Sequence, residues 1–169
     1  MTAMTETETP EYLADLHVGV LSLNYNSNGP LTAPIWYDYD PGGELWFITG
    51  PNSLKGKLLE VGVRLSLVAQ SEEPPYKYVS VEGPVVSISE STEDELLAMA
   101  VRYLGETGGQ QYTENSNVSG GVLVRVKPER WLAVDYGKGS GVSLKLLKEY
   151  PQVQLPLCNK RPQEREYIK

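Results

Sequence analysis

The stretch Glu44-Leu-Trp-Phe-Ile-Thr-Gly-Pro-Asn-Ser-Leu-Lys-Gly-Lys57 decides the fold, because it joins a strand pattern to a helix start. Residues 44–49 are rich in β-prone side chains and predict a strand. Gly50 to Ser53 predicts a turn. The leucine spacing over residues 54–61 predicts a helix, with Ser53 at the N-cap position.

This strand–turn–helix unit predicts a phosphate site. A helix start offers free backbone N–H groups to an anion. Ser53 adds a hydroxyl, and Lys55 and Lys57 add positive charge. The glycine spacing of a Walker loop is missing. A capped surface helix with solvated lysines fits the same residues, and the sequence leaves both interpretations open.

Short apolar runs between glycine and proline turns predict antiparallel strands on both sides of this unit. The predicted strands are His17–Asn24, Leu31–Tyr39, Glu44–Thr49 in a hairpin with the preceding strand, Arg64–Gln70, Tyr76–Ser89 with a bend near Gly83-Pro84, and Gly121–Pro128, which Arg130–Tyr136 extends or follows. The fold class expected from this count is mainly β, a six-stranded antiparallel barrel with peripheral helices.

Helices are predicted beside these strands. A short helix fits residues 11–16. Another runs from Ser91 to about Leu104, because a hydroxyl cap is followed by acids that suit the helix dipole. Residues 105–118 are polar and glycine-rich, and no element is predicted there.

Length and composition fit a single globular domain, with 169 residues of which 40% are hydrophobic and 22% charged. We expect a flexible tail over residues 1–10, a domain over 11–136 and a C-terminal extension over 137–169 of open packing. There is no apolar run of about 18 residues and no leader peptide pattern. A lone cysteine, Cys158, predicts a cytoplasmic protein without disulfides.

Charge and residue counts exclude several kinds of site. The net charge of −7, from 15 basic and 22 acidic residues, disfavours nucleic acid as a partner. One histidine, His17, and one cysteine leave little for a zinc site or a Ser-His-Asp triad. We therefore expect the chemistry to belong to a bound group, and no catalytic side chain or metal site is predicted.

Aromatic residues are dense in the hairpin and recur later in the chain. Trp36, Tyr37, Tyr39, Trp46 and Phe47 fit either the lining of a planar-ligand pocket or core packing. Tyr76-Lys77-Tyr78 fits either an anion-binding strand or an exposed strand face. Trp131 fits either a pocket cap or an anchor for the last strand.

The chain resembles the pyridoxamine-phosphate-oxidase-like family, the flavin-binding split β-barrels that include flavin- and deazaflavin-dependent oxidoreductases. The resemblance covers roughly residues 17–135. It rests on the order and spacing of these motifs: Pro34-x-Trp36, Leu45-Trp-Phe-Ile-Thr49, Ser53-x-Lys55, Arg64-Leu-Ser-Leu67 and Pro75-Tyr-Lys-Tyr-Val-Ser-Val-Glu-Gly83. It implies a six-stranded split barrel that forms a homodimer, with two cofactor sites at the interface.

The resemblance also implies a set of cofactor-binding residues. They are Pro34, Ile35 and Trp36 along the flavin ring, Ile48 and Thr49 on the flavin side, Ser53, Lys55 and Lys57 at the phosphate, Lys77 or Tyr78 in place of a glutamine, and Trp131 from the neighbouring subunit. The oxidase has an arginine just before the phosphate lysine, where this chain has Leu54. Phosphate binding is therefore expected to depend on the two lysines.

The implied function is an FMN-dependent oxidoreductase with a small-molecule substrate that the sequence leaves open. The arginine- and histidine-bearing substrate motif of the true oxidase is missing after Trp131, so oxidation of vitamin B6 is not expected. Two alternatives stay open. One is an oxidoreductase that uses the deazaflavin F420, and the other is a flavin- or haem-binding protein without turnover.

Overall fold

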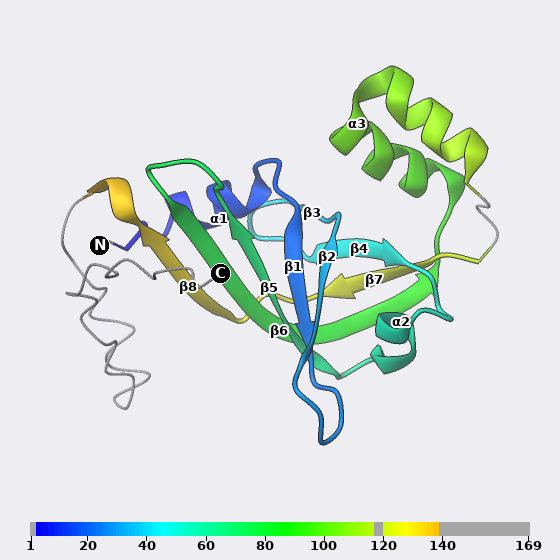
Figure 1. The fold of residues 1–169 in the computed structure, drawn as a ribbon, viewed down its shortest axis with the longest axis horizontal. Helices are drawn as coiled ribbons and strands as arrows, with labels where there is room; N and C mark the ends of the chain where they lie inside the picture. Colours follow the sequence, from blue (N-terminus) through cyan, green and yellow to red (C-terminus); the bar gives the residue numbers. More distant parts are fainter. Residues whose placement is uncertain (1–2, 117–119, 139–169) are drawn as a thin grey trace, which may run out of the picture.

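Figure 1 shows a computed structural model of the chain, which describes residues 3–116 and 120–138. Its elements are α1 (Glu8–Ala14), β1 (Gly19–Leu23), β2 (Leu31–Ile35), β3 (Asp38–Tyr39), β4 (Leu45–Thr49), α2 (Leu54–Leu58), β5 (Arg64–Gln70), β6 (Lys77–Glu90), α3 (Glu93–Asn115), β7 (Val122–Val126), β8 (Arg130–Asp135) and a 3-10 turn (Tyr136–Lys138). None of the helices among these described residues is long and apolar enough to cross a membrane.

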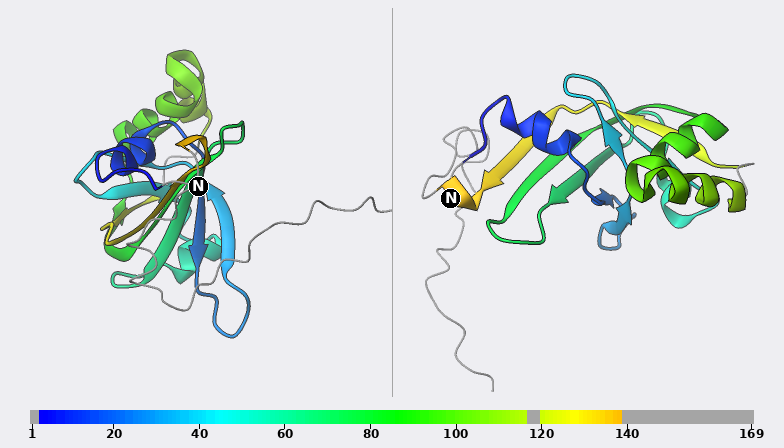
Figure 2. Two further views of the ribbon diagram at one scale, coloured as in Figure 1. Left: turned by 90° about the vertical axis from the view of Figure 1, so that its left-hand side faces the viewer. Right: turned by 90° about the horizontal axis from the view of Figure 1, so that it is seen from above.

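The long strand β6 connects the two halves of the sheet. Its first half pairs with β5 and β8, and its second half pairs with β7. The strand order is β2-β1-β5-β6-β7-β4-β3, with β8 beside β6 off this path, and every pairing is antiparallel. The views in Figure 2 show this sheet curling around its core. The predicted mainly β split-barrel fold is confirmed.

A bend in β6 allows the curl. The pairing with β7 shifts register between Val85 and Ser87, close to the bend predicted at Gly83-Pro84. Such a bulge bends a strand and increases its twist. Gly83 is required here, because a Cβ atom would lie 1.8 Å from the carbonyl oxygen of Lys127.

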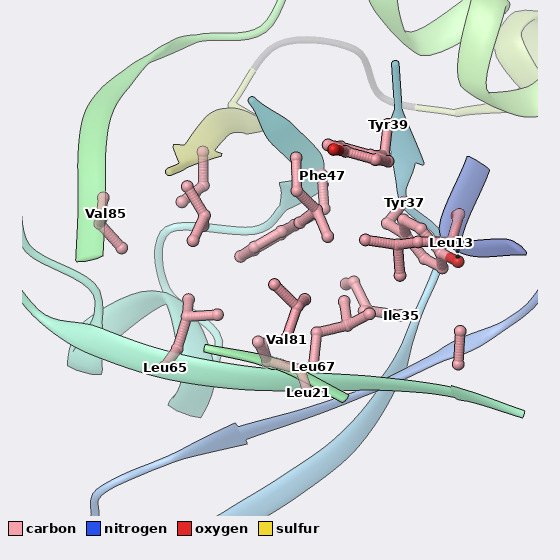
Figure 3. Packing of buried hydrophobic residues seen from close by; sticks show 14 of the residues in the cluster. Leu13, Leu21, Ile35, Tyr37, Tyr39, Phe47, Leu65, Leu67, Val81 and Val85 are labelled. Atoms are coloured by element: carbon pink, nitrogen blue, oxygen red, sulfur yellow. Dashed lines mark hydrogen bonds between the residues drawn. The ribbon is translucent and has the colours of Figure 1, made fainter. Parts of the chain in front are cut away.

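The core fills the concave side of the sheet (Figure 3). Alternate residues of β5 (Leu65, Leu67 and Ala69) point inward, as the period of two along a strand requires. Phe47 and Tyr37 are completely buried among them. The Tyr37 hydroxyl donates to the Leu13 carbonyl at 2.8 Å, which ties α1 to the core. Burial of each large side chain contributes about 1.5–3 kcal/mol.

The prediction of one strand over Leu31–Tyr39 is wrong. The segment divides into β2, which pairs with β1, and β3, which pairs with β4. Between them, the Tyr37 N–H donates to the Tyr103 hydroxyl at 3.0 Å instead of to a neighbouring strand. With this division, and with β8 as a separate strand, the described residues hold eight strands instead of six.

The absence of an element predicted over residues 105–118 is also wrong, since α3 runs to Asn115. Thr92 caps this helix and forms a capping box with Glu95, which confirms the predicted helix start. Gly105 has a φ of 74° and reverses the helix, so α3 consists of two segments, residues 93–104 and 106–115. Figure 1 shows the second segment folded back along the first.

The other helices differ slightly from their predicted bounds. Helix α1 begins at Glu8, inside the stretch expected to be a flexible tail, and α2 ends at Leu58 instead of Val61. Most of the C-terminal extension predicted over residues 137–169 lies outside the described residues.

Candidate functional site

A cleft of about 320 Å³ lies between α3, the end of β4 and the start of β7. It is lined by Trp36, Ile48, Thr49, Gly50, Ser91, Leu96, Met99, Tyr112, Ser116, Gly120 and Gly121. None of these lining residues carries a charge. The walls combine apolar side chains with hydroxyl groups, a combination that suits a neutral, flat ring with a few polar edge atoms.

Two tyrosines of α3 hold Trp36 at the wall of this cleft. The Trp36 ring stacks on Tyr103 at a centroid distance of 4.9 Å and an interplanar angle of 6°. Tyr112, from the second segment of α3, lies 5.4 Å from the same ring at an angle of 50°. The reversal at Gly105 brings Tyr103 and Tyr112 to one tryptophan.

The predicted phosphate residues lie next to the cleft. The Thr49 and Ser53 hydroxyl oxygens are 3.4 Å apart. The Ser53 hydroxyl accepts from the Gly56 N–H at 3.0 Å, which confirms Ser53 as the N-cap of α2, and donates to the Gly50 carbonyl at 2.7 Å. Its proton is thereby used inside the turn. Lys55, which is half-buried, and Lys57, which is exposed, follow on α2.

Gly121 leaves space at the cleft wall, and Gly120 sets the backbone conformation beside it. A Cβ atom on Gly121 would lie 2.6 Å from the Ser91 Oγ and 3.3 Å from the Ile48 Cγ2, both at the cleft wall. Gly120 has a φ of 125°, which favours glycine. The residues present therefore fit a flat ring, because the cleft walls are uncharged and Gly121 lies close against Ser91 and Ile48. Lysines that could bind a phosphate follow on α2.

A second hollow, of about 520 Å³, contains two other predicted residues. Lys77 and Tyr78 line it together with Gln70, Ser71, Glu72, Tyr76 and Tyr136. The Lys77 ammonium pairs with Asp135 at 3.1 Å, and the Asp135 side chain is 4% exposed. Burial by itself would raise the Asp135 pKa. Bonds from the Gly137 N–H and Lys77 outweigh it, so this pKa lies below its ordinary value.

The two hollows are far apart within one chain. Lys77 begins β6, while Glu90, at the other end, pairs with Val122 beside Thr49. At about 3.3 Å per residue, β6 spans roughly 40 Å of strand. Lys77 and Tyr78 therefore do not share a cleft with Thr49 of the same chain.

The remaining predicted residues also lie outside the cleft. Pro34 is exposed on β2, and Ile35 is buried in the core with 8% exposure. Trp131 packs against Tyr39, at a centroid distance of 5.9 Å. Within one chain the structure thus brings together Trp36, Ile48 and Thr49, with Ser53 adjoining them.

Sequence analysis missed the wall supplied by α3. Leu96 and Met99 are three residues apart on a capped helix, a spacing that predicts one common face. No local pattern marks Tyr112 or Ser116, because they reach the cleft only through the reversal at Gly105. Among the described residues, no group of three or more His, Cys, Asp or Glu is placed to hold a metal ion.

No family model and no curated protein matches this sequence. Solved structures resemble it in fold. An F420 reductase has 21% identity and a TM-score of 0.61, over 72% of this chain and 94% of its own. The FAD-binding protein of Mycobacterium smegmatis has 16% identity and a TM-score of 0.52, over 79% and 97%.

A putative pyridoxamine 5'-phosphate oxidase of Listeria innocua has 16% identity and a TM-score of 0.56, over 76% of this chain and 97% of its own. At these identities the likeness concerns the fold. The chain has the split β-barrel fold of the pyridoxamine-phosphate-oxidase-like proteins.

Proposed function

We propose that this chain is a flavin-type oxidoreductase of the pyridoxamine-phosphate-oxidase-like family, with the cofactor ring in the cleft of Trp36, Thr49 and Tyr112. The observation that carries the proposal is this uncharged cleft in a fold shared with an F420 reductase and an FAD-binding protein. The bound cofactor would supply hydride or electron transfer. The chain's own residues would orient the ring and exclude water from it.

The phosphate of the cofactor would lie toward α2. Thr49 is at the cleft and Ser53 caps α2, so the two are neighbours at the same end of β4. The Ser53 hydroxyl proton goes to the Gly50 carbonyl, so it is not available to the phosphate. We therefore assign the binding of the phosphate charge to Lys55 and Lys57. Ser53 would then act mainly by shaping the turn.

We propose a homodimer as the functional unit. The cleft, at about 320 Å³, is near the lower end of the roughly 300–1,000 Å³ typical of small-molecule pockets, enough for a ring and not for a whole dinucleotide-sized cofactor. Lys77, Tyr78 and Trp131 lie elsewhere in the same chain. In a dimer all three would complete the partner's site, as the family resemblance implies for Trp131.

The outer face of the sheet supports association. Across β1, β5, β6 and β8 the register aligns Val20, Val68, Ser80 and Leu132. All four are half-buried, face away from the core and carry no charge. Such a row of small and apolar side chains is suited to pack against a second copy of the chain.

We take FMN as the first cofactor and F420 as the second. F420 carries a polyglutamate tail, which a basic groove near the site would favour, and Lys77, which could supply part of such a groove, is paired with Asp135. Lys55 and Lys57 suffice for one phosphate. F420 stays the second candidate, because an F420 reductase is among the solved structures that share this fold.

Titration of the purified full-length chain with FMN and with F420, followed by absorbance and tryptophan fluorescence, tests the proposal. We expect saturable binding of one of them with 1:1 stoichiometry per chain. Turnover with a nicotinamide donor or with reduced F420 then separates an oxidoreductase from a protein that only binds its ligand. Binding of neither compound contradicts the proposal.

Lys55→Ala tests the phosphate assignment within the same titration. Loss of one charged contact is expected to weaken FMN binding by about tenfold to a hundredfold, because such contacts contribute about 1.5–3 kcal/mol. Lys127→Ala, which removes an exposed lysine beyond the other end of β7, is the matched control. Equal affinities of the two variants would overturn the assignment of Lys55.

A further inference from the structure

Tyr103 stacks its ring on Trp36, and its hydroxyl group bonds the backbone of the next residue, Tyr37. The ring stacks on the indole at 4.9 Å. The hydroxyl accepts from the Tyr37 N–H at 3.0 Å, and its proton goes to the His17 carbonyl at 2.6 Å or the Tyr37 carbonyl at 2.9 Å. Tyr103 itself does not line the cleft.

These hydrogen bonds form at a break in the sheet, where the backbone has no partner strand. Trp36 and Tyr37 lie between β2 and β3, outside the ladders that those strands form with β1 and β4. Backbone groups in such a break need other partners. The Tyr103 hydroxyl accepts from the Tyr37 N–H and donates to the His17 or the Tyr37 carbonyl, and so holds the backbone next to Trp36.

The neighbouring residues fix Tyr103 in turn. Arg102 donates to the Ala14 carbonyl at 2.6 Å and pairs with Asp38 at 3.1 Å, which anchors this turn of α3 to α1 and β3. Burial raises the pKa of Tyr103, so its hydroxyl keeps the proton that it donates. The Tyr103 ring that stacks on Trp36 is therefore held in place by the hydrogen bonds and the ion pair of this turn of α3.

We propose that Tyr103 is a positioning residue for the candidate site: its ring and hydroxyl fix the orientation of Trp36, and thereby the aromatic wall on which the cofactor ring packs. The proposal rests on the proposed function for its ligand, while its geometric claim concerns Trp36 alone. It also gives α3, which lies between β6 and β7 in the chain, a role in a site at the end of β4.

Two substitutions separate the ring from the hydroxyl. Tyr103→Leu removes both and is expected to weaken FMN or F420 binding by about tenfold, the upper range for an aromatic pair. Tyr103→Phe keeps the stacked ring and is expected to lose about threefold. Leu104→Ala, on the adjacent exposed residue of α3, is the control and is expected to bind within twofold of the unaltered chain.

A spectroscopic readout tests the geometry without a ligand. The chain has three tryptophans, and in a Trp46→Phe/Trp131→Phe background only Trp36 remains. Acrylamide quenching of its fluorescence, well below the unfolding temperature, is expected to increase about twofold or more in Tyr103→Leu as the covering ring is lost. Tyr103→Phe should show the same quenching constant as the Trp46→Phe/Trp131→Phe protein, because the stacked ring is kept.

The outcomes are distinct. If the chain binds neither cofactor, the proposed function fails, and the quenching series still decides the role of Tyr103. If Tyr103→Leu keeps the parent quenching constant, or if it binds the cofactor as tightly as Leu104→Ala does, the positioning role is overturned. For Tyr103→Leu, weaker binding with unchanged Trp36 quenching overturns it as well, since the effect of losing the ring would then not pass through Trp36.

Discussion

Gly109 lies where the two segments of α3 fold against each other, and Gly109→Ala is expected to force them apart. A Cβ atom there would lie 2.6 Å from the Val101 N, 2.7 Å from its Cα and 2.6 Å from its Cγ2. Carbon atoms in good contact are about 3.5–4.0 Å apart. The segments must therefore separate by about 1 Å.

The magnitude follows from two opposing effects. Alanine favours a helix over glycine by about 0.8–1 kcal/mol. Overpacking against a fixed neighbour costs about 1–3 kcal/mol. Because the contact is with backbone atoms of Val101, which cannot turn away, the cost is larger. We expect Gly109→Ala to lower the free energy of unfolding by about 1–2 kcal/mol.

Urea denaturation of both Gly109→Ala and Gly108→Ala measures this difference. At Gly108 a Cβ atom would lie 3.0 Å from the Cβ of Leu104, a single contact that is longer than those at Gly109 and involves a residue that is 44% exposed. For Gly108→Ala the gain in helix propensity and the cost of this contact nearly cancel. The free energy of unfolding is therefore expected to change by no more than about 0.5 kcal/mol. A more stable Gly109→Ala variant would refute the fold-back of α3 and, with it, the placement of Tyr112 at the cleft.

Two further predictions concern the pH dependence at His17 and the ion pair between Lys77 and the buried Asp135. The His17 Nε2 is buried without a hydrogen-bond partner in the part of the chain that the structure describes, and burial lowers the His17 pKa. As pH falls below about 6.5 the unfolded chain gains this proton before the native one does, so the free energy of unfolding should decrease. His17→Gln should reduce that decrease in denaturation at pH 7.0 and 5.5, and an identical decrease would contradict the role of His17. Asp135→Asn removes the charge that Lys77 and the Gly137 N–H stabilise, and is expected to cost about 1–3 kcal/mol at pH 7. Because the Asp135 pKa is lowered, this contribution is complete above about pH 4 and is lost in acid, so a variant equally destabilised at pH 7 and at pH 2.5 would contradict it.

Much of the barrel could be predicted because its strands are bounded by local signals. Arg64–Gln70 was predicted with the bounds of β5, since it alternates buried and exposed residues and ends at a polar, proline-containing loop. The break at Trp36 and Tyr37 could not be predicted. It depends on a hydroxyl 66 residues further along the chain, which replaces the ladder bonds of a continuous strand.

The second segment of α3 shows the limit of composition. Glycines at 105, 108 and 109 favour a loop by propensity. In the structure Gly105 makes the reversal and Gly109 allows the close contact with Val101, so packing overrides propensity. Tyr112 and Ser116 reach the cleft wall through this packing, which explains why sequence analysis missed them.

The site was predicted best where its residues are close in sequence. Local chemistry marked Ser53, and the family resemblance added Ile48 and Thr49, which precede it at the end of β4. Lys77, Tyr78 and Trp131 entered through the family resemblance, and they lie elsewhere within one chain. In the homodimer that we propose, their role would depend on the arrangement of two subunits, which spacing along a sequence does not determine.

The most direct test of the central claim is a crystal structure of the full-length chain equilibrated with FMN or F420. The account predicts the tricyclic ring between Trp36, Thr49 and Tyr112, with the phosphate at Lys55. A ring bound elsewhere on the chain, or this cleft closed while the cofactor is bound at another site, would contradict it.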